Sequence, residues 1–276
     1  MPTRRLVLGL LLSSFGFACA TEAAAAEPVK VLVVKEHGVG SAAQAQPLLD
    51  KFLGFAAKKL GWDSAKGAFI SSTSAAEGYI RAEKPAFAIL SLRAMLPFHA
   101  THKLEILGQA EITQPGGREY HLVSKSAADL GACRGKKLAT NHAEDARFVE
   151  RVVAGGAFKL ADFELVATKR ALQGIKMVQS GEAVCALIDD AQLAELAHIE
   201  GGKELRSVWK SAKLPPMVVV AFPSAPAAEK KALANGLEAL CKADGEAICK
   251  EIGIAALRPA SAQTYAEVLA KYGKAQ

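Results

Sequence analysis

The 276-residue sequence lacks most features that mark nucleic-acid-binding proteins and small disulfide-rich proteins. It has five cysteines, and aromatic residues make up only 6% of the chain. Basic residues exceed acidic ones by 34 to 28, but they are scattered in pairs such as Lys58-Lys59 rather than gathered in runs. Nucleic-acid binding needs a concentrated basic stripe, and base stacking needs aromatic side chains. The composition therefore argues against a nucleic-acid partner.

No apolar run reaches the roughly 20 residues that a membrane span requires. The run over residues 6–17 follows two arginines and precedes small residues that end at Ala26. This order predicts a cleavable signal peptide over 1–26, with cleavage after Ala26 preferred to cleavage after Ala20. Twin-arginine export and lipid anchoring through Cys19 are the less favoured alternatives. We expect the mature chain to be soluble and periplasmic.

Four cysteines remain after cleavage, and an even number in an oxidising compartment suggests disulfides. Cys241 and Cys249 flank a predicted helix break and are the first choice for a pair. Cys133 and Cys185 would form the second pair, which would require their segments to be neighbours in one sheet. Four buried thiols are the alternative. No cysteine or histidine cluster indicates a metal site, and no cofactor is predicted.

Strand and helix patterns alternate along the mature chain. Apolar runs predict strands over 29–34, 68–71, 86–90, 104–110, 120–124, 137–140, 163–167, 184–188, 205–209 and 217–222. Apolar residues at helical spacing, with their stop signals, predict helices over 43–60, 94–99, 144–154, 171–179, 191–198, 227–242, 247–252 and 262–272, and a short helix that ends near 82. This alternation predicts an α/β fold with βαβ units.

Proline and glycine breaks at 114–117 and 215–216 divide the pattern into three parts. The simplest arrangement is two lobes, each a mostly parallel sheet flanked by helices, between which the chain crosses twice. Lobe one would comprise 27–113 plus 215–276, and lobe two 116–212. Ligands bind at the carboxyl ends of strands in open α/β sheets, so we expect the site in the cleft between the lobes.

Polar side chains near the ends of the predicted strands, toward this cleft, are the candidate ligand-binding groups. They are Glu36, His37, Ser41, Ser72, Thr73, Ser91, Arg93, Tyr120, Asn141, His142 and Asp189. Arg93 is suited to clamp an anion, and Tyr120 to stack on a ligand or donate to it. Each group also has a structural alternative: Ser72, Asn141 and Asp189 are good helix caps, and a tyrosine in a strand usually packs.

An ordered set of segments carries a family resemblance. The set consists of 79–82 with 86–90, Asp129-Leu130 with 134–139, 179–184 leading to Ile188-Asp189, Pro215-Pro216 before 218–220, and Gly253-Ile254 with Tyr265. It resembles the extracytoplasmic solute-binding proteins of ABC importers, of the phosphate/phosphonate-binding type (type 2 periplasmic binding proteins). The resemblance implies a monomeric, non-catalytic protein. Such a protein captures a small ligand in the interlobe cleft by hinge closure and delivers it to an ABC permease in the inner membrane.

The sequence departs from this family at its oxyanion turn. Phosphonate binders carry a Ser-Thr-Ser turn after the first strand of lobe two, whereas residues 140–145 read TNHAED. The family's later histidine is absent near 168–170, and its acidic residue is matched by Asp189. An amine, a neutral solute or a lipid-like molecule is therefore an alternative ligand, and a sensor or adaptor for a membrane receptor is an alternative role. Neither a GxSxG nor an HExxH motif is present to suggest an enzyme.

Overall fold

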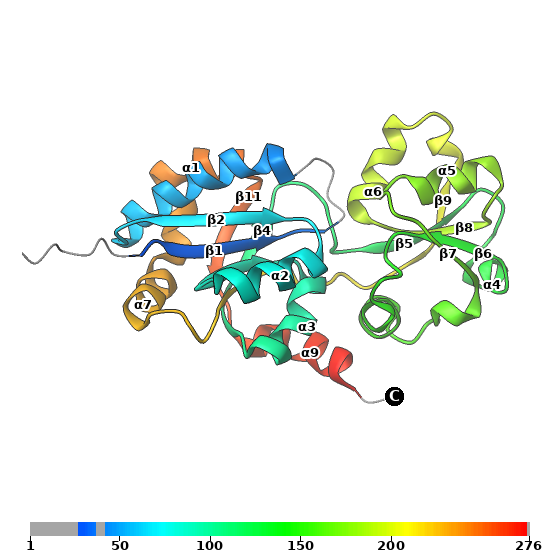
Figure 1. The fold of residues 1–276 in the computed structure, drawn as a ribbon. Helices are drawn as coiled ribbons and strands as arrows, with labels where there is room; N and C mark the ends of the chain where they lie inside the picture. The colour runs from blue at the N-terminus through cyan, green and yellow to red at the C-terminus, as the bar shows by residue number, and fades with distance from the viewer. Residues whose placement is uncertain (1–26, 37–41, 275–276) are drawn as a thin grey trace, which may run out of the picture.

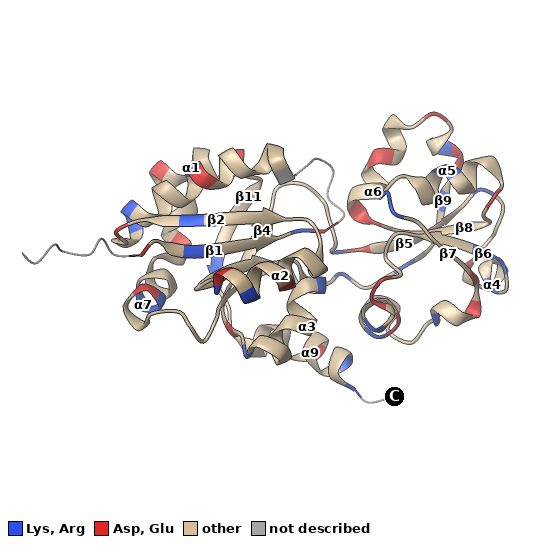
Figure 2. Ribbon diagram, in the orientation of Figure 1, with Lys and Arg blue, Asp and Glu red and all other residues tan. Residues whose placement is uncertain are grey.

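The computed structural model describes residues 27–36 and 42–274 (Figure 1). The predicted signal peptide lies outside the described residues, and so do His37 and Ser41. None of the helices in the described ranges is long and apolar enough to cross a membrane. Two sheets, each flanked by helices, form two lobes that lie side by side, as the sequence predicts. Basic and acidic residues are spread over both lobes (Figure 2).

The first sheet has six strands in the order β11-β4-β10-β3-β1-β2. The bounds are β1 Val29–Val34, β2 Ala65–Ile70, β3 Phe87–Leu90, β4 Glu105–Ile112, β10 Met217–Ala221 and β11 Ile254–Pro259. β1 is parallel to β2 and β3, whereas β10 lies antiparallel between β3 and β4, and β11 is antiparallel to β4. Most strands therefore run in one direction, and their apolar sequences suit a sheet that is covered on both faces.

The second sheet has five strands in the order β7-β6-β8-β5-β9. The bounds are β5 Tyr120–Ser124, β6 Lys137–Thr140, β7 Glu164–Ala167, β8 Cys185–Asp189 and β9 Arg206–Lys210. β6 is parallel to β7 and β8, and β5 is antiparallel to β8 and β9. The chain thus leaves the first sheet after β4 and returns to it at β10. The boundaries of the lobes themselves stay a prediction.

Helices cover both faces of each sheet. In the first lobe, α1 (Ala42–Leu60), α7 (Ala227–Gly236) and α8 (Glu246–Glu251) pack on one face. α2 (Thr73–Glu83), α3 (Leu92–His102) and α9 (Ala266–Gly273) pack on the other. In the second lobe, α5 (Gln173–Ser180) and α6 (Asp190–Glu195) lie across the sheet from α4 (Leu130–Cys133) and a π-helix (Phe148–Val153). One apolar cluster runs from Leu32 in β1 to Leu187 in β8, so the core is continuous between the lobes.

Some predicted elements differ from the structure. β11 was not predicted as a strand, because residues 254–259 lie between two helical patterns and end in proline. The predicted helix over 144–154 contains the π-helix. Glu144 and Asp145 are not helical, because the helical turns begin after them. The predicted helix over 227–242 ends as an α-helix at Gly236 and continues as a 3-10 helix, Leu237–Cys241.

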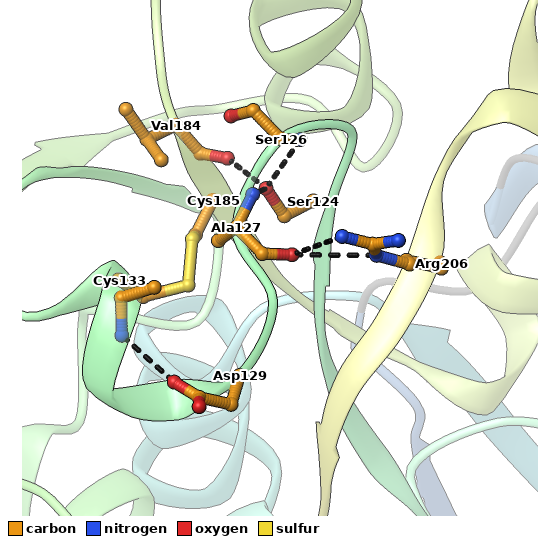
Figure 3. Close-up of a disulfide and its surroundings, with 9 residues drawn as sticks. Ser124, Ser126, Ala127, Asp129, Cys133, Val184, Cys185 and Arg206 are labelled. Carbon is orange, nitrogen blue, oxygen red and sulfur yellow. Dashed lines mark hydrogen bonds between the residues drawn. A yellow bond between two sulfur atoms is a disulfide. The ribbon is translucent and has the colours of Figure 1, made fainter.

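Two disulfides join the pairs that the sequence predicts. Cys241 and Cys249 are bonded across the break between α7 and α8, and Cys133 is bonded to Cys185. The expectation that the second pair joins neighbouring strands is wrong, because Cys133 ends the short helix α4 and only Cys185 lies in the sheet (Figure 3). The turn before α4 brings the two together: the Ser124 hydroxyl donates to the Val184 carbonyl at 2.7 Å.

Candidate functional site

A cleft lies where the two lobes meet. It is lined by Lys35, Glu36, Ser91, Leu92, Arg93, Ile112, Gly116, Gly117, Arg118, Tyr120, Asp189, Ala191, Pro215 and Met217. These residues come from the ends of β1, β3 and β8, from the first strand of lobe two, and from both chain crossings. The enclosed space is about 40 Å³, which is room for a few water molecules. A larger solute therefore requires the lobes or the lining side chains to move apart.

Glu36 is held by two hydroxyl groups on the lobe-one side of the cleft. Its carboxylate accepts a hydrogen bond from Thr73 Oγ1 at 2.7 Å and a short one from the Ser91 hydroxyl. Ser91 is also the N-cap of α3 and accepts from the Ala94 N–H at 3.1 Å. These bonds tie the end of β1 to the starts of α2 and α3. Glu36 thus fixes the shape of this wall of the cleft.

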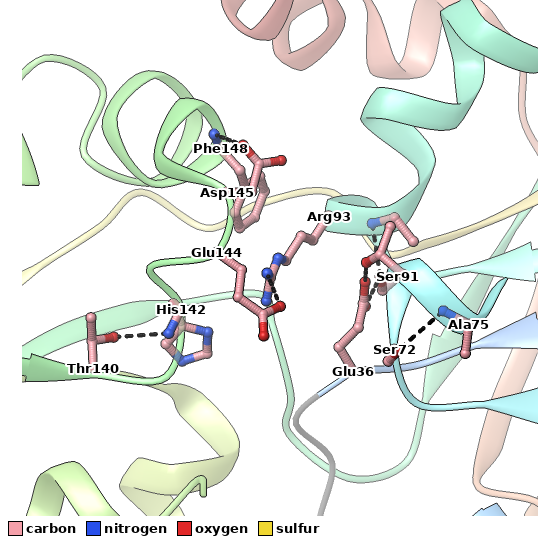
Figure 4. Close-up of polar contacts among 12 residues, drawn as sticks. Glu36, Ser72, Ala75, Ser91, Arg93, Thr140, His142, Glu144, Asp145 and Phe148 are labelled. Atoms are coloured by element: carbon pink, nitrogen blue, oxygen red, sulfur yellow. Dashed lines mark hydrogen bonds and ion pairs between the residues drawn. The ribbon is translucent and has the colours of Figure 1, made fainter. Parts of the chain in front are cut away.

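Arg93 extends from the first turn of α3 across the cleft toward the other lobe (Figure 4). Its side chain is only 6% exposed, and Nη2 donates to Glu144 Oε2 at 3.0 Å. The Glu144 side chain is 78% exposed and precedes the π-helix of lobe two. The pair is therefore asymmetric, with a buried cation from one lobe and a solvated acid from the other. A buried guanidinium requires a compensating anion. The exposed carboxylate can instead give up the ion pair and be hydrated at little cost in free energy.

Three further ionisable groups face this cleft from buried or half-buried positions. Burial raises the pKa of Asp189 to about 6, although the backbone N–H of Gln192 favours the charged form. Burial lowers the pKa of Lys35, against the attraction of Asp189 and Asp190. Burial also raises the pKa of Tyr120 well above its usual value, so its hydroxyl stays protonated and can act as a donor.

Asn141 and His142 form a buried network behind the cleft. His142 Nε2 lies 2.8 Å from Gln192 Oε1, and Gln192 Nε2 donates to Asn141 Oδ1 at 3.1 Å. Gln192 also closes a capping box with Asp189, whose side chain accepts from the Gln192 N–H at 2.9 Å. The His142 ring meets Tyr120 edge-on, with 5.1 Å between ring centroids. The network therefore orients two cleft residues, Asp189 and Tyr120.

The structure brings together part of the predicted site. Glu36, Ser91, Arg93, Tyr120 and Asp189 line the cleft, and Thr73 reaches it through Glu36. Ser72 does not line it. It caps α2, where its hydroxyl accepts from the Ala75 N–H, and it is exposed. Asn141 and His142 do not line it either, because they are buried in the network just described.

Sequence reasoning missed Lys35, Arg118 and Gln192. Lys35 directly follows β1, so its position at a strand end was a usable signal. Arg118 belongs to the first crossing, and its Nε donates to the Leu214 carbonyl of the second crossing at 3.0 Å. Gln192 gives no signal beyond its place three residues after Asp189, as in a capping box. Within 27–36 and 42–274, histidine, cysteine and acidic residues form no group of three that could hold a metal.

Comparisons with known proteins agree with this architecture. A protein from Xanthomonas citri bound to ATP is 13% identical, with a TM-score of 0.67, over 88% of this chain and 96% of that one. A binding protein component of an ABC phosphonate transporter from Pseudomonas aeruginosa is 15% identical, with a TM-score of 0.65, over 88% and 85%. A Prochlorococcus marinus protein in complex with methylphosphonate is 12% identical, with a TM-score of 0.64, over 87% and 95%.

At such identities, these structures show a shared fold. No curated protein matches the sequence. Residues 42–265, however, match the family described as "ABC transporter, phosphonate, periplasmic substrate-binding protein". The match covers both sheets except β1, and it includes the cleft residues from Ser91 to Met217. Members of this family bind substrates for ABC transporters, which implies an exported protein with a small ligand and a membrane permease partner. The chain belongs to the family of periplasmic substrate-binding proteins of ABC phosphonate transporters.

Proposed function

We propose that this protein captures a small anionic solute in the cleft between its lobes and presents it to an ABC permease. It performs no catalysis in this role. The anionic group binds the guanidinium of Arg93, and Lys35 and Arg118 add positive charge to the same wall. Closure of the lobes about the two chain crossings, residues 114–118 and 214–216, then surrounds the solute.

The asymmetry of the Arg93–Glu144 pair carries this proposal. Arg93 is 6% exposed and Glu144 is 78% exposed, so the carboxylate can return to water while the guanidinium remains buried. An anion that enters the cleft can replace Glu144 on Arg93 with bidentate geometry. In the ligand-free protein, Glu144 then occupies the position on Arg93 that the anionic solute takes when it binds.

The turn over residues 140–145 of lobe two supports an anion site on lobe one. Thr140 Oγ1 donates to the Leu187 carbonyl at 2.8 Å, and Asp145 accepts from the Phe148 N–H at 2.9 Å. The polar groups of this turn are thus engaged within the protein. A phosphonate, sulfonate or carboxylate head is therefore expected to depend more on Arg93 than on this turn.

A thermal-shift screen with phosphonates, sulfonates, carboxylates, amines and neutral solutes tests the proposal. An anion at about a hundred times its Kd should add roughly 2.7 kcal/mol of stability to the wild-type protein. Arg93→Gln should reduce that gain to about half or less, as a loss of at least tenfold in affinity implies. Arg81→Gln is the matched control, because Arg81 is exposed on α2 and pairs with Glu77 of its own helix. A shift that amines alone produce, or that Arg93→Gln leaves unchanged, would contradict the proposal.

A further inference from the structure

A mainly apolar cavity adjoins the cleft in lobe one, between the first half of α1 and the β11–α8 edge. Its volume is about 410 Å³, which falls in the range of small-molecule sites. Its walls are mainly apolar and include Leu48, Leu49, Phe52, Phe69, Ile89 and Ile112. The floor is the face of the first sheet that α1 and α8 cover farther along.

The cavity lies directly beside the cleft. Lys35, Ile112 and Met217 line both spaces, so the two share a wall at the ends of β1 and β4 and the start of β10. The guanidinium groups of Arg93 and Arg118 lie on the cleft side of that wall. A single molecule could therefore place a charged head in the cleft and an apolar part in the cavity.

Leu48 shows that this apolar surface is incompletely covered. Its side chain is 38% exposed and lines the cavity. Neighbouring Leu49 and Phe52 turn inward to the core of the same lobe. Burying such a surface against a ligand is favourable in proportion to the apolar area removed from water.

We propose that the ligand is an amphiphilic anion, whose head binds Arg93 in the cleft and whose alkyl tail fills the cavity beside α1. This inference rests on the proposed function and adds the substrate class to it. Lys35 lines both the cleft, where the head binds, and the cavity, where the tail binds. Lys250 and Glu251 also line the cavity, and Glu251 already pairs with Lys51 at 2.7 Å, so the tail is expected to end in a methyl group rather than a second charge.

The test is calorimetric titration of the protein expressed from its full-length sequence. The probes are alkylphosphonates, alkylsulfonates and alkylcarboxylates with one, four and eight tail carbons, and octan-1-ol. Each buried methylene contributes up to about 0.8 kcal/mol, or roughly fourfold in affinity. We expect the eight-carbon anion to bind at least fiftyfold more tightly than its one-carbon homologue.

Ala45→Trp places an indole in the cavity, because Ala45 lines it on α1. This variant should weaken the eight-carbon anion at least tenfold and leave the one-carbon anion unchanged. Ala43→Trp is the matched control, since Ala43 is an exposed residue of the same helix that does not line the cavity. It should leave both affinities unchanged.

The outcomes separate this inference from the proposed function. If a one-carbon anion binds through Arg93 and affinity does not rise with tail length, the tail site is wrong and the proposed function stands. The same holds if Ala45→Trp does not weaken the long anion. If octan-1-ol binds as tightly as the eight-carbon anions, the two-part site is wrong. If no anion of any length binds, both proposals fail.

Discussion

Arg93 and Asp189 hold charge in positions that little water reaches. Arg93 comes from lobe one and is balanced by the solvated Glu144, whereas Asp189 comes from lobe two and is held by the backbone of α6. A buried charge is stable only beside a group that compensates it, so the charge of each residue is sensitive to the groups around it in the cleft. A change of pH around 6 alters the charge of Asp189, because burial raises its pKa to about that value.

Asp189 is expected to make stability depend on pH. Its pKa is about 6 in the folded protein and 3.8 in the unfolded chain, so the folded state binds a proton more readily. Stability should therefore fall as the pH rises from about 4 to 6, by about 3 kcal/mol in total from this group. Asp189→Asn keeps a capping side chain and removes the titration. Denaturant unfolding should find the variant more stable than wild type at pH 8, but not at pH 4.

Asp190 is the control for this effect, because it neighbours Asp189 and its side chain accepts from the Arg118 N–H. Asp190→Asn should give a smaller gain at pH 8, because it removes only the contribution of the Asp190 charge to the raised pKa of Asp189. An Asp189→Asn profile that runs parallel to wild type from pH 4 to pH 8 would show that this carboxyl has an ordinary pKa.

At the scale of secondary-structure elements, the two disulfides close loops of different length. Cys133–Cys185 closes a separation of 52 residues, and Cys241–Cys249 closes one of 8. In the chain-entropy account, the longer closure contributes about 4 kcal/mol and the shorter about 2.5 kcal/mol. Replacing Cys133 and Cys185 together with serine should therefore destabilise the protein more than replacing Cys241 and Cys249. Urea unfolding of the two double variants checks the order, and the reverse order would contradict this account.

Gly67 in β2 allows two strands and a helix to approach closely. A Cβ built there would lie 2.4 Å from the Val31 carbonyl oxygen of β1 and 2.7 Å from Leu53 Cδ1 of α1. Gly67→Ala should destabilise the protein by about 1–3 kcal/mol through overpacking. Gly54→Ala is the control, since a Cβ at that exposed position of α1 meets nothing within 4 Å. It should instead stabilise the helix by about 1 kcal/mol; equal effects in thermal unfolding would refute the close approach.

The elements with a clear period were predictable from the sequence, and those set by distant contacts were not. The predicted bounds are those of the structure for β1, β5 and β6. Few conformations other than a buried strand suit a short apolar run between polar loops. β11 depends on pairing with β4, more than a hundred residues earlier, and its own sequence resembles a link between helices. The cleft was predictable as a set of strand ends. The pairing of Arg93 with Glu144 was not, because it depends on how the lobes meet.

For the molecule as a whole, at least four connections within the described residues join the lobes, one of which is the Arg93–Glu144 pair. Two are the chain crossings, which Arg118 ties together through the Leu214 carbonyl. The fourth is α9, whose Tyr272 hydroxyl donates to Asp145 Oδ2 at 3.0 Å and whose ring lies 5.1 Å from the Arg147 guanidinium carbon. The last helix of lobe one thus rests on the π-helix of lobe two, on the same side as the Arg93–Glu144 pair. Opening of the cleft must break these side-chain links and can leave the crossings intact.

Glu144→Gln combined with Tyr272→Phe should therefore open the ligand-free protein. Each substitution removes one polar link between the lobes, worth about 1 kcal/mol, and each shifts the closed-to-open equilibrium roughly fivefold. Small-angle scattering should show a larger radius of gyration for the double variant. Lys230→Gln, which breaks a pair with Glu105 within lobe one, should leave the radius unchanged. An unchanged double variant would mean that other contacts hold the lobes.

The central claim is that an anionic solute replaces Glu144 on Arg93. The most direct test is calorimetric titration of wild type, Arg93→Gln and Glu144→Gln with methylphosphonate, methanesulfonate and acetate, which share a methyl group and differ in the anion. For the anion that binds wild type, Arg93→Gln should lose at least about tenfold in affinity, as expected for a charged hydrogen bond. Glu144→Gln should gain several-fold, because it removes both the competing carboxylate and a contact that closes the empty cleft. Weaker binding by Glu144→Gln, or unchanged binding by Arg93→Gln, would contradict the account.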